Sequence, residues 1–280
     1  MSDTYSCFKV SVELGIAHIQ LSRPDALNSM IPEFWRELPA LVDRLDETGD
    51  VRVVVISSTG KHFSAGMDLS VFTEMAKRFK GEPARRAEKM RRSVLSLQDS
   101  FSSLERARMP VLVAIQGGAI GGAVDMISAA DCRYCTKDAF FCIKETQIGM
   151  TADVGTLQRL PKLIPAGLVK ELAFTGRNWH ADEALAQGFV NQVFENEEAM
   201  LEGVMRIAKS IAMNSPMAVA GTKEMLNYAR DHSVQESLNY MATWQSGMFQ
   251  MPDIFEALEA QKEKRVPRYE AILSKGNSFD

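Results

Sequence analysis

The 280-residue chain has few cysteines, no excess of basic residues and no long apolar run. Its four cysteines include one C-x-x-C pair, Cys132 and Cys135, without a second Cys or His pair at zinc-ligand spacing. We therefore expect reduced thiols, with metal or redox use as the alternative. The net charge of −4 argues against a nucleic-acid partner. Because no apolar run is long enough to cross a bilayer, we expect no membrane insertion.

Targeting signals are also missing from both ends of the sequence. The first residues, MSDTYSCFKV, have neither the basic nor the apolar region of a signal peptide, and they are not rich in arginine. The last residues, SKGNSFD, do not match the peroxisomal S-K-L address. The simplest expectation is a cytoplasmic protein.

What the sequence does contain is typical of a globular α/β protein. Hydrophobic residues make up 46% and charged residues 24% of the chain. Alternation around Leu14-Gly15 predicts a hairpin, and valine-rich runs at 51–58 and 110–116 predict buried strands. Strands alternate with helices up to about residue 195, which indicates an α/β fold.

Helices are predicted from start and stop signals along the chain. One begins after Ser29, a candidate N-cap, and contains Pro39, which should kink or split it. After residue 195 the patterns indicate helices alone. The helices expected there span 197–213, 216–230, 233–248 and 252–264.

The stretch IQGGAIGGAVD, residues 115–125, has four glycines in six positions between a predicted strand and a predicted helix. It lacks the Lys-Ser/Thr of a Walker loop and does not fit the G-x-G-x-x-G spacing. Glycines at a helix N-terminus can expose N–H groups to an oxygen that becomes negative during a reaction. Tight packing of strand on helix, without a ligand, is the alternative.

A second loop, HFSAGMDL at residues 62–69, also follows a buried strand and also leads into a helix. Together with LSRPDALNSM, PVLVAIQGGAIGGAVDMISAADCRY and GTLQRLP, it resembles the enoyl-CoA hydratase/isomerase (crotonase) superfamily, from about Phe8 to Glu259. The resemblance implies a spiral of ββα turns with a helical C-terminal oligomerisation region. We expect residues 1–195 to form the core with the acyl-CoA site and residues 196–280 to form the helical region.

The resemblance also implies how the substrate is held. The backbone N–H groups of Met67 and Gly122 would form an oxyanion hole for an acyl-CoA thioester carbonyl. His62 lies beside this loop, and we expect it to have a structural role. The residues expected to bind the substrate are Ser64, Ala65, Gly66, Met67, Asp68 and Gly122.

Three acids suggest which reaction follows. Enoyl-CoA hydratases have glutamates at the positions of Asp125 and Glu145, whereas this chain has aspartate at the first and a further acid, Asp153. The triplet resembles the delta(3,5)-delta(2,4)-dienoyl-CoA isomerases of unsaturated fatty acid β-oxidation. That reaction removes a proton at C2 and adds one at C6, four bonds away, so two acids are needed. The resemblance implies Asp153 as base and Glu145 as acid, while Asp125 tunes the pair.

Each acid also has a simpler interpretation. Asp125 could stabilise the first turn of its helix, Glu145 could pair with Lys144 or another cation, and Asp153 could cap the helix near Gly155. Rival functions are a 2-enoyl-CoA hydratase, hydrolysis or dehalogenation by a nucleophilic Asp153, and a non-catalytic acyl-CoA-binding protein. Asp125, Glu145 and the cost of burying three acids in one apolar pocket argue against these in turn.

The expected cofactors and partners follow from the same resemblance. No metal or redox cofactor is implied, because CoA arrives as part of the substrate. A homotrimer or a dimer of trimers is expected, with contacts made by the helical C-terminal region.

Overall fold

The computed structural model describes residues 5–78, 80–249 and 251–276. Its main sheet has six strands in the order β1-β2-β3-β4-β6-β9. Only β1 and β2 pair antiparallel, and they form the predicted hairpin, which turns at Leu14 and Gly15 with positive φ. All other neighbours are parallel. The strands are β1 (Phe8–Glu13), β2 (Ile16–Leu21), β3 (Val53–Ser58), β4 (Val111–Ile115), β6 (Cys132–Thr136) and β9 (Gln192–Phe194).

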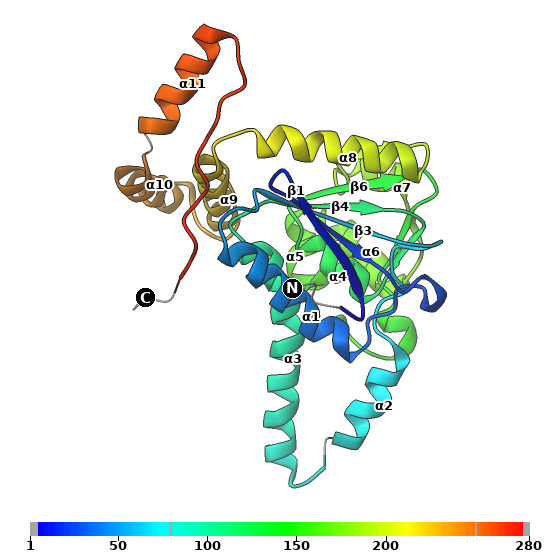
Figure 1. The fold of residues 1–280 in the computed structure, drawn as a ribbon. Coiled ribbons are helices and arrows are strands. Elements are labelled where there is room, and N and C mark those ends of the chain that lie inside the picture. Colours follow the sequence, from blue (N-terminus) through cyan, green and yellow to red (C-terminus); the bar gives the residue numbers. More distant parts are fainter. Residues whose placement is uncertain (1–4, 79, 250, 277–280) are drawn as a thin grey trace.

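Both faces of this sheet are covered, which explains the apolar runs of β3 and β4. Val53 and Val55 face α8 (Glu197–Ala212), whereas Val54 and Ile56 face the main core. Figure 1 shows α8 along one face of the sheet and the helices of the core on the other. The first helix after residue 195, α8, thus packs on the sheet of the preceding part. The division of the chain at residue 195 stays a prediction.

The opposite face carries an aromatic core. Phe34 and Trp35 of α1 contact Phe101 of α3 at ring-centroid distances of 6.4 and 5.1 Å. The outer ends of α2 and α3 project from the body (Figure 1). The helices before β9 are α1 (Pro32–Glu47), α2 (Leu69–Arg78), α3 (Pro83–Arg106), α4 (Gly122–Ser128), α5 (Thr156–Arg159), α6 (Ala166–Thr175) and α7 (Ala181–Ala186), with 3-10 turns η1 (Pro24–Ala26), η2 (Glu145–Ile148) and η3 (Leu160–Lys162).

A second sheet of three short strands, β5-β7-β8, supports the glycine-rich stretch. β5 pairs parallel with β7, and β7 pairs antiparallel with β8. The stretch is therefore partly a strand and not only a loop, because its backbone completes this sheet. The strands are β5 (Gly118–Ile120), β7 (Phe140–Cys142) and β8 (Trp179–His180).

Two expectations about α1 need correction. The residue that precedes this helix is Ile31, and no side chain caps its first turn. The Ser29 hydroxyl instead donates to Asp68 Oδ2 at 2.7 Å, so it ties the segment before α1 to the loop before α2. Pro39 lies inside one continuous helix and does not split it.

After β9 the described residues form helices and extended segments without a further strand, as predicted. The segment 265–276 runs back along the body from the end of α11, which stands away from the sheet (Figure 1). No helix among the described residues is long and apolar enough to cross a membrane. The helices that follow α8 are α9 (Pro216–Asp231), α10 (Val234–Met248) and α11 (Met251–Glu263).

Candidate active site

The structure brings the two predicted loops together. Ser64 N donates to Gly118 O at 3.2 Å, and Ile120 N donates to Ser64 O at 3.0 Å, which joins the loop before α2 to β5. At Gly66, which has φ +81°, an added Cβ would collide with Ile120 O and would lie 3.1 Å from Gly122 N. Glycine is required there because the two backbones approach so closely.

Among the described residues, no hydrogen bond engages the backbone N–H of Met67 or that of Gly122, where the two loops meet. Met30 bridges to Met67 through Gly66 O (2.8 Å) and Asp68 N (3.1 Å), so the bridge leaves the N–H of Met67 itself unused. Gly122 is the first residue of α4, where a helix leaves its N–H groups without intrahelical partners. A Cβ built on Gly122 would lie 3.7 Å from Met67 N, which places both donors at one spot.

The polar side chains of the first loop, Ser64 and Asp68, hold its shape. The Ser64 hydroxyl donates to Asn28 O at 2.8 Å and accepts from Gly66 N at 3.1 Å. The Asp68 carboxylate accepts from Ser29 and from Ser70 N, and these hydrogen bonds lower its pKa. Ala65 N donates to Leu27 O at 2.9 Å. The loop therefore offers backbone groups to a ligand.

His62 supports the second loop. Its Nδ1 accepts a hydrogen bond from Gly118 N at 2.9 Å, which fixes the start of β5. The ring also lies edge-on to Phe140, with centroids 6.0 Å apart. This agrees with the structural role that the sequence predicts.

Asp125 is fully buried in α4. Its Oδ1 accepts a hydrogen bond from the backbone N–H of Thr156 at 2.6 Å, while Oδ2 has no partner among the described residues. Burial raises the pKa of Asp125 to about 6, and the charge of Asp153 adds to this. The carboxylate caps another helix, α5, and is not satisfied within the first turn of its own helix.

Glu145 begins η2 beside the glycines, and its side chain is buried. Its Oε1 would lie 3.2 Å from a Cβ on Gly121, and its Oε2 has no partner among the described residues. Burial and then the charge of Asp125 raise the pKa of Glu145 to about 7. Lys144 donates to Gln147, and the described residues include no ion pair to Glu145. Pairing with Lys144 is therefore not observed.

Asp153 is half-buried in the segment between η2 and α5. Burial raises its pKa, and its charge in turn raises the pKa values of Asp125 and Glu145. The residue that precedes α5 is Gly155, and no side chain caps this helix from that position. Asp153 is thus not the cap that the simpler interpretation assigns to it. The structure gathers all three predicted acids into one electrostatically coupled group.

The amino-acid sequence that builds this site also matches a known family model. The model described as "Enoyl-CoA hydratase/isomerase" matches residues 11–272. The chain belongs to the enoyl-CoA hydratase/isomerase family. This membership confirms the crotonase-type α/β fold that the sequence predicts.

Several curated family members are similar over most of the chain. A mouse protein named "Delta(3,5)-Delta(2,4)-dienoyl-CoA isomerase, mitochondrial" is 46% identical over 91% of this chain and 79% of its own length. The human protein of the same name is 44% identical over 94% of this chain and 81% of its own. An Arabidopsis thaliana dienoyl-CoA isomerase, named as peroxisomal, is 39% identical over 95% of this chain and 96% of its own.

Solved structures of the family have the same fold. An enoyl-CoA hydratase from Bacillus anthracis superposes with a TM-score of 0.83 at 30% identity, over 94% of this chain and 99% of its own. A protein from Streptomyces coelicolor, called a putative enoyl-CoA hydratase, gives a TM-score of 0.86 at 24% identity, over 96% of each chain. The second likeness bears on the fold alone.

The cysteines and acids of the described residues form no other candidate site. All four cysteines are free, and three of them are buried. No group of three or more His, Cys, Asp or Glu residues in the described part of the chain is arranged to hold a metal ion. A groove of about 850 Å³ lies between the β1-β2 hairpin and α8, but none of the three acids lines it. The candidate site is therefore the acid group beside the paired N–H groups.

Proposed function

We propose that the protein isomerises 3,5-dienoyl-CoA to 2,4-dienoyl-CoA. The observation that carries the proposal is the gathering of Asp125, Glu145 and Asp153 beside the free N–H groups of Met67 and Gly122. The names of the three curated relatives described above support the same substrate class. A hydratase would share the two N–H groups, but aspartate at position 125 and the third acid favour the isomerase.

In this proposal the two N–H groups form an oxyanion hole. They donate to the thioester oxygen of the acyl-CoA as the loss of the C2 proton gives that oxygen negative charge. Donors that are already oriented stabilise such charge more than water does. The loop 64–68 keeps Met67 in place, since its own side chains are bonded inward. Its backbone and that of Gly122 bind the thioester end of the substrate.

Two of the acids then remove one proton from the acyl chain and add another to it. Asp153 takes the proton from C2, the C3=C4 and C5=C6 electron pairs shift to C2=C3 and C4=C5, and Glu145 gives a proton to C6. A pKa of about 7 keeps a large share of Glu145 protonated at neutral pH, as a general acid requires. Asp125 moves no proton in this proposal. Its charge adds to the effect of burial and raises the pKa of Glu145.

We propose no cofactor beyond the CoA of the substrate. The reaction transfers protons within one carbon chain and leaves its overall oxidation state unchanged, so the atom balance needs no electron carrier. The chain's own carboxyl groups supply both proton transfers.

A subunit assembly is proposed for the C-terminal helices. Residues of α9, α10 and α11, and Phe249 at the end of α10, expose large apolar side chains, and an exposed apolar patch is typical of an interaction surface. A trimer or a dimer of trimers would cover this surface. The side chains that are more than half exposed are Leu226, Val234, Leu238, Phe249, Phe255 and Leu258.

The cytoplasmic location stays a prediction. The similar animal proteins are named as mitochondrial and the plant protein as peroxisomal. Imaging of the tagged full chain in its own cell would decide among the three compartments.

One assay tests the proposed reaction. The protein is mixed with a 3,5-dienoyl-CoA and, separately, with a 2-enoyl-CoA, and the ultraviolet spectra are followed. Conjugation with the thioester should appear with the first substrate and should persist with the second. Loss of conjugation from the 2-enoyl-CoA, without isomerisation of the diene, would identify a hydratase instead.

A further inference from the structure

Three polar side chains on one face of α3 lie behind the segment Asp153–Thr156. Gln98, Ser102 and Glu105 follow helical spacing, so they share that face. Gln98 Nε2 donates to the backbone oxygen of Asp153 at 2.7 Å. Because this bond is to the main chain, it fixes the position of Asp153 without engaging its carboxyl group.

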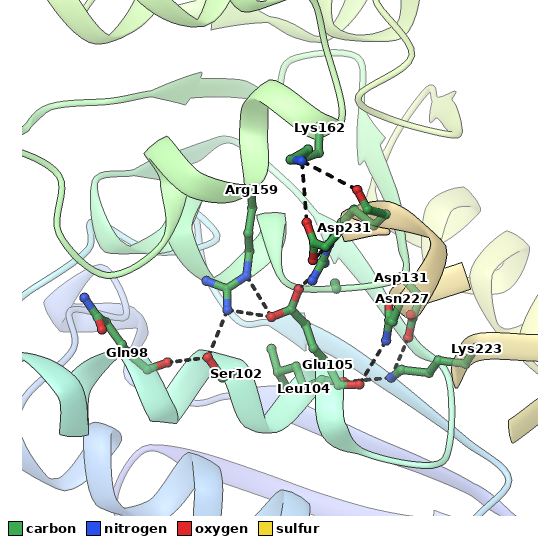
Figure 2. A network of polar contacts seen from close by, with 12 residues as sticks. Gln98, Ser102, Leu104, Glu105, Asp131, Arg159, Lys162, Lys223, Asn227 and Asp231 are labelled. Carbon is green, nitrogen blue, oxygen red and sulfur yellow. Dashed lines mark hydrogen bonds and ion pairs between the residues drawn. The ribbon is translucent and has the colours of Figure 1, made fainter. Parts of the chain in front are cut away.

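Arg159 contacts the same helix face, as Figure 2 shows, and it also contacts the segment. Its Nη2 donates to Glu105 Oε2 at 2.6 Å and to Ser102 Oγ at 3.0 Å, and its Nε donates to Glu105 Oε2 at 3.0 Å. Its Nη1 lies 3.4 Å from Val154 O. An Arg guanidinium presents several donors in a fixed plane, so these bonds hold the side chain in one orientation.

The guanidinium also lies directly on the backbone of the segment. Gly155 has φ +137°, and a Cβ there would collide with Arg159 Nη1. The arginine and the glycine therefore form one close-packed unit. On the other side of this unit, Thr156 N donates to Asp125 Oδ1 at 2.6 Å.

The segment thus contacts α3 and is also joined to two of the three acids. It carries Asp153 itself, and it orients Asp125 through the Thr156 amide. The positive charge of Arg159 acts on Asp125 as well, because it opposes the rise in the pKa of that carboxyl. The charge of Asp153 acts on Asp125 in the opposite direction and raises its pKa.

We propose that Arg159 is a positioning residue for proton transfer, which clamps Asp153–Thr156 against Glu105 so that Asp153 and Asp125 keep their places. The kinetic part of this inference rests on the proposed isomerase function. Its geometric part does not, because the Thr156–Asp125 hydrogen bond can be observed without turnover.

Arg230 of α9 provides a matched control. It donates from Nη1 to Glu105 Oε1 at 2.5 Å, so it binds the second oxygen of the carboxylate that Arg159 binds. Its described hydrogen bonds reach Glu105 and Asp231 but not the segment. Arg159→Met and Arg230→Met each remove one cation from Glu105 and leave the other, so both variants keep a partner for this partly buried acid.

The test compares both variants with the wild type. Loss of alignment should lower the kcat of Arg159→Met by about 10- to 100-fold with little change in KM, since misplacement of a reacting group has costs of that order. Arg230→Met should keep a kcat close to that of the wild type. Wild-type kcat in Arg159→Met, or equal losses in both variants, would overturn the proposal.

A second readout is independent of activity. The amide proton resonance of Thr156, measured by 1H–15N NMR, should lie downfield in the wild type because the amide donates to a carboxylate. It should move upfield in Arg159→Met and stay in place in Arg230→Met. An unmoved resonance in Arg159→Met overturns the positioning role. If the variants show these shifts but the wild type has no isomerase activity, the proposed function is refuted and the positioning role of Arg159 is not.

Discussion

Together with burial, the carboxylate of Asp125 in α4 raises the pKa of the Glu145 carboxyl at the start of η2. Neither acid has a hydrogen bond among the described residues to its second oxygen, Oδ2 or Oε2. Two incompletely bonded acids in one interior site are costly, because burial penalises their charged forms. Burial and the charge of Asp125 therefore favour the protonated form of Glu145, which is the form that the proposed general acid needs at the start of the reaction.

Glu145→Gln should change how stability depends on pH. Since the pKa of Glu145 rises from 4.5 unfolded to about 7 folded, folding favours its protonated form. That contribution is fully present below pH 4.5 and is lost as pH rises towards 7, on the order of 3 kcal/mol in all. The glutamine variant has no titrating group at this position, so its free energy of unfolding should not fall for this reason as pH rises. Denaturant unfolding at several pH values should therefore show the variant gaining on the wild type across this window.

Glu183→Gln is a control of opposite sign. Arg177 lowers the pKa of Glu183, so the wild-type pair loses stability as pH falls through that lowered value. Parallel stability curves for Glu145→Gln and the wild type would show that Glu145 titrates normally in the folded protein.

Asp153→Asn and Glu145→Gln should each slow isomerisation by at least roughly 100-fold, because each removes a group that takes or gives a proton. Substrate affinity should change little, since backbone groups hold the thioester. In deuterated water, Glu145→Gln should still exchange the C2 hydrogen, whereas Asp153→Asn should exchange neither C2 nor C6. The opposite exchange pattern would swap the two roles, and near wild-type rates in both variants would refute the reaction.

Gly122→Pro should abolish one donor of the proposed oxyanion hole. Proline lacks an N–H but suits the first position of a helix, which Gly122 occupies in α4. Loss of one such donor lowers kcat by about 100- to 1000-fold. Gly122→Ala keeps the N–H but adds a Cβ 3.3 Å from Met30 Sδ and 3.7 Å from Met67 N, so it measures the effect of an added side chain apart from loss of the donor. Unchanged turnover in a folded Gly122→Pro protein would make Gly122 a packing residue.

The assembly can be tested on α11. Light scattering of the wild type at micromolar concentration should give three or six times the chain mass of 31.1 kDa. Phe255→Glu together with Leu258→Glu places charge on an apolar face and should yield smaller species. Gln261→Glu adds charge at an exposed polar position of the same helix and should leave the mass unchanged. A monomeric wild type would contradict the proposed assembly.

Sequence patterns predicted the long elements and the candidate acids, because periodicity and motif order carry that information. They missed β5 and β8, since strands of three and two residues leave almost no pattern. They also placed Ser29 at a helix start, although its hydroxyl bonds to Asp68, a partner that only the folded chain brings near.

Parts of the site that depend on folding could not be read from spacing. The amide of Thr156 bonds to Asp125 from 31 positions away, and Arg159 contacts Glu105 from 54 positions away. A backbone donor has no residue type that would reveal it. For Arg159, the sequence offered only the motif GTLQRLP, without a reason for its arginine.

The segment after α11 gives this helix a second anchor. Ser215 bonds to Asp253 at the start of α11, and beyond its end Arg52 donates to Tyr269 O at 2.6 Å while Lys275 N donates to Glu47 O at 2.9 Å. Because the chain is bonded to the body on both sides of α11, the folded chain has little conformational freedom left to lose in this region. The apolar face of α11 is therefore preorganised within a single chain, and most of its ordering entropy is lost on folding and not on association.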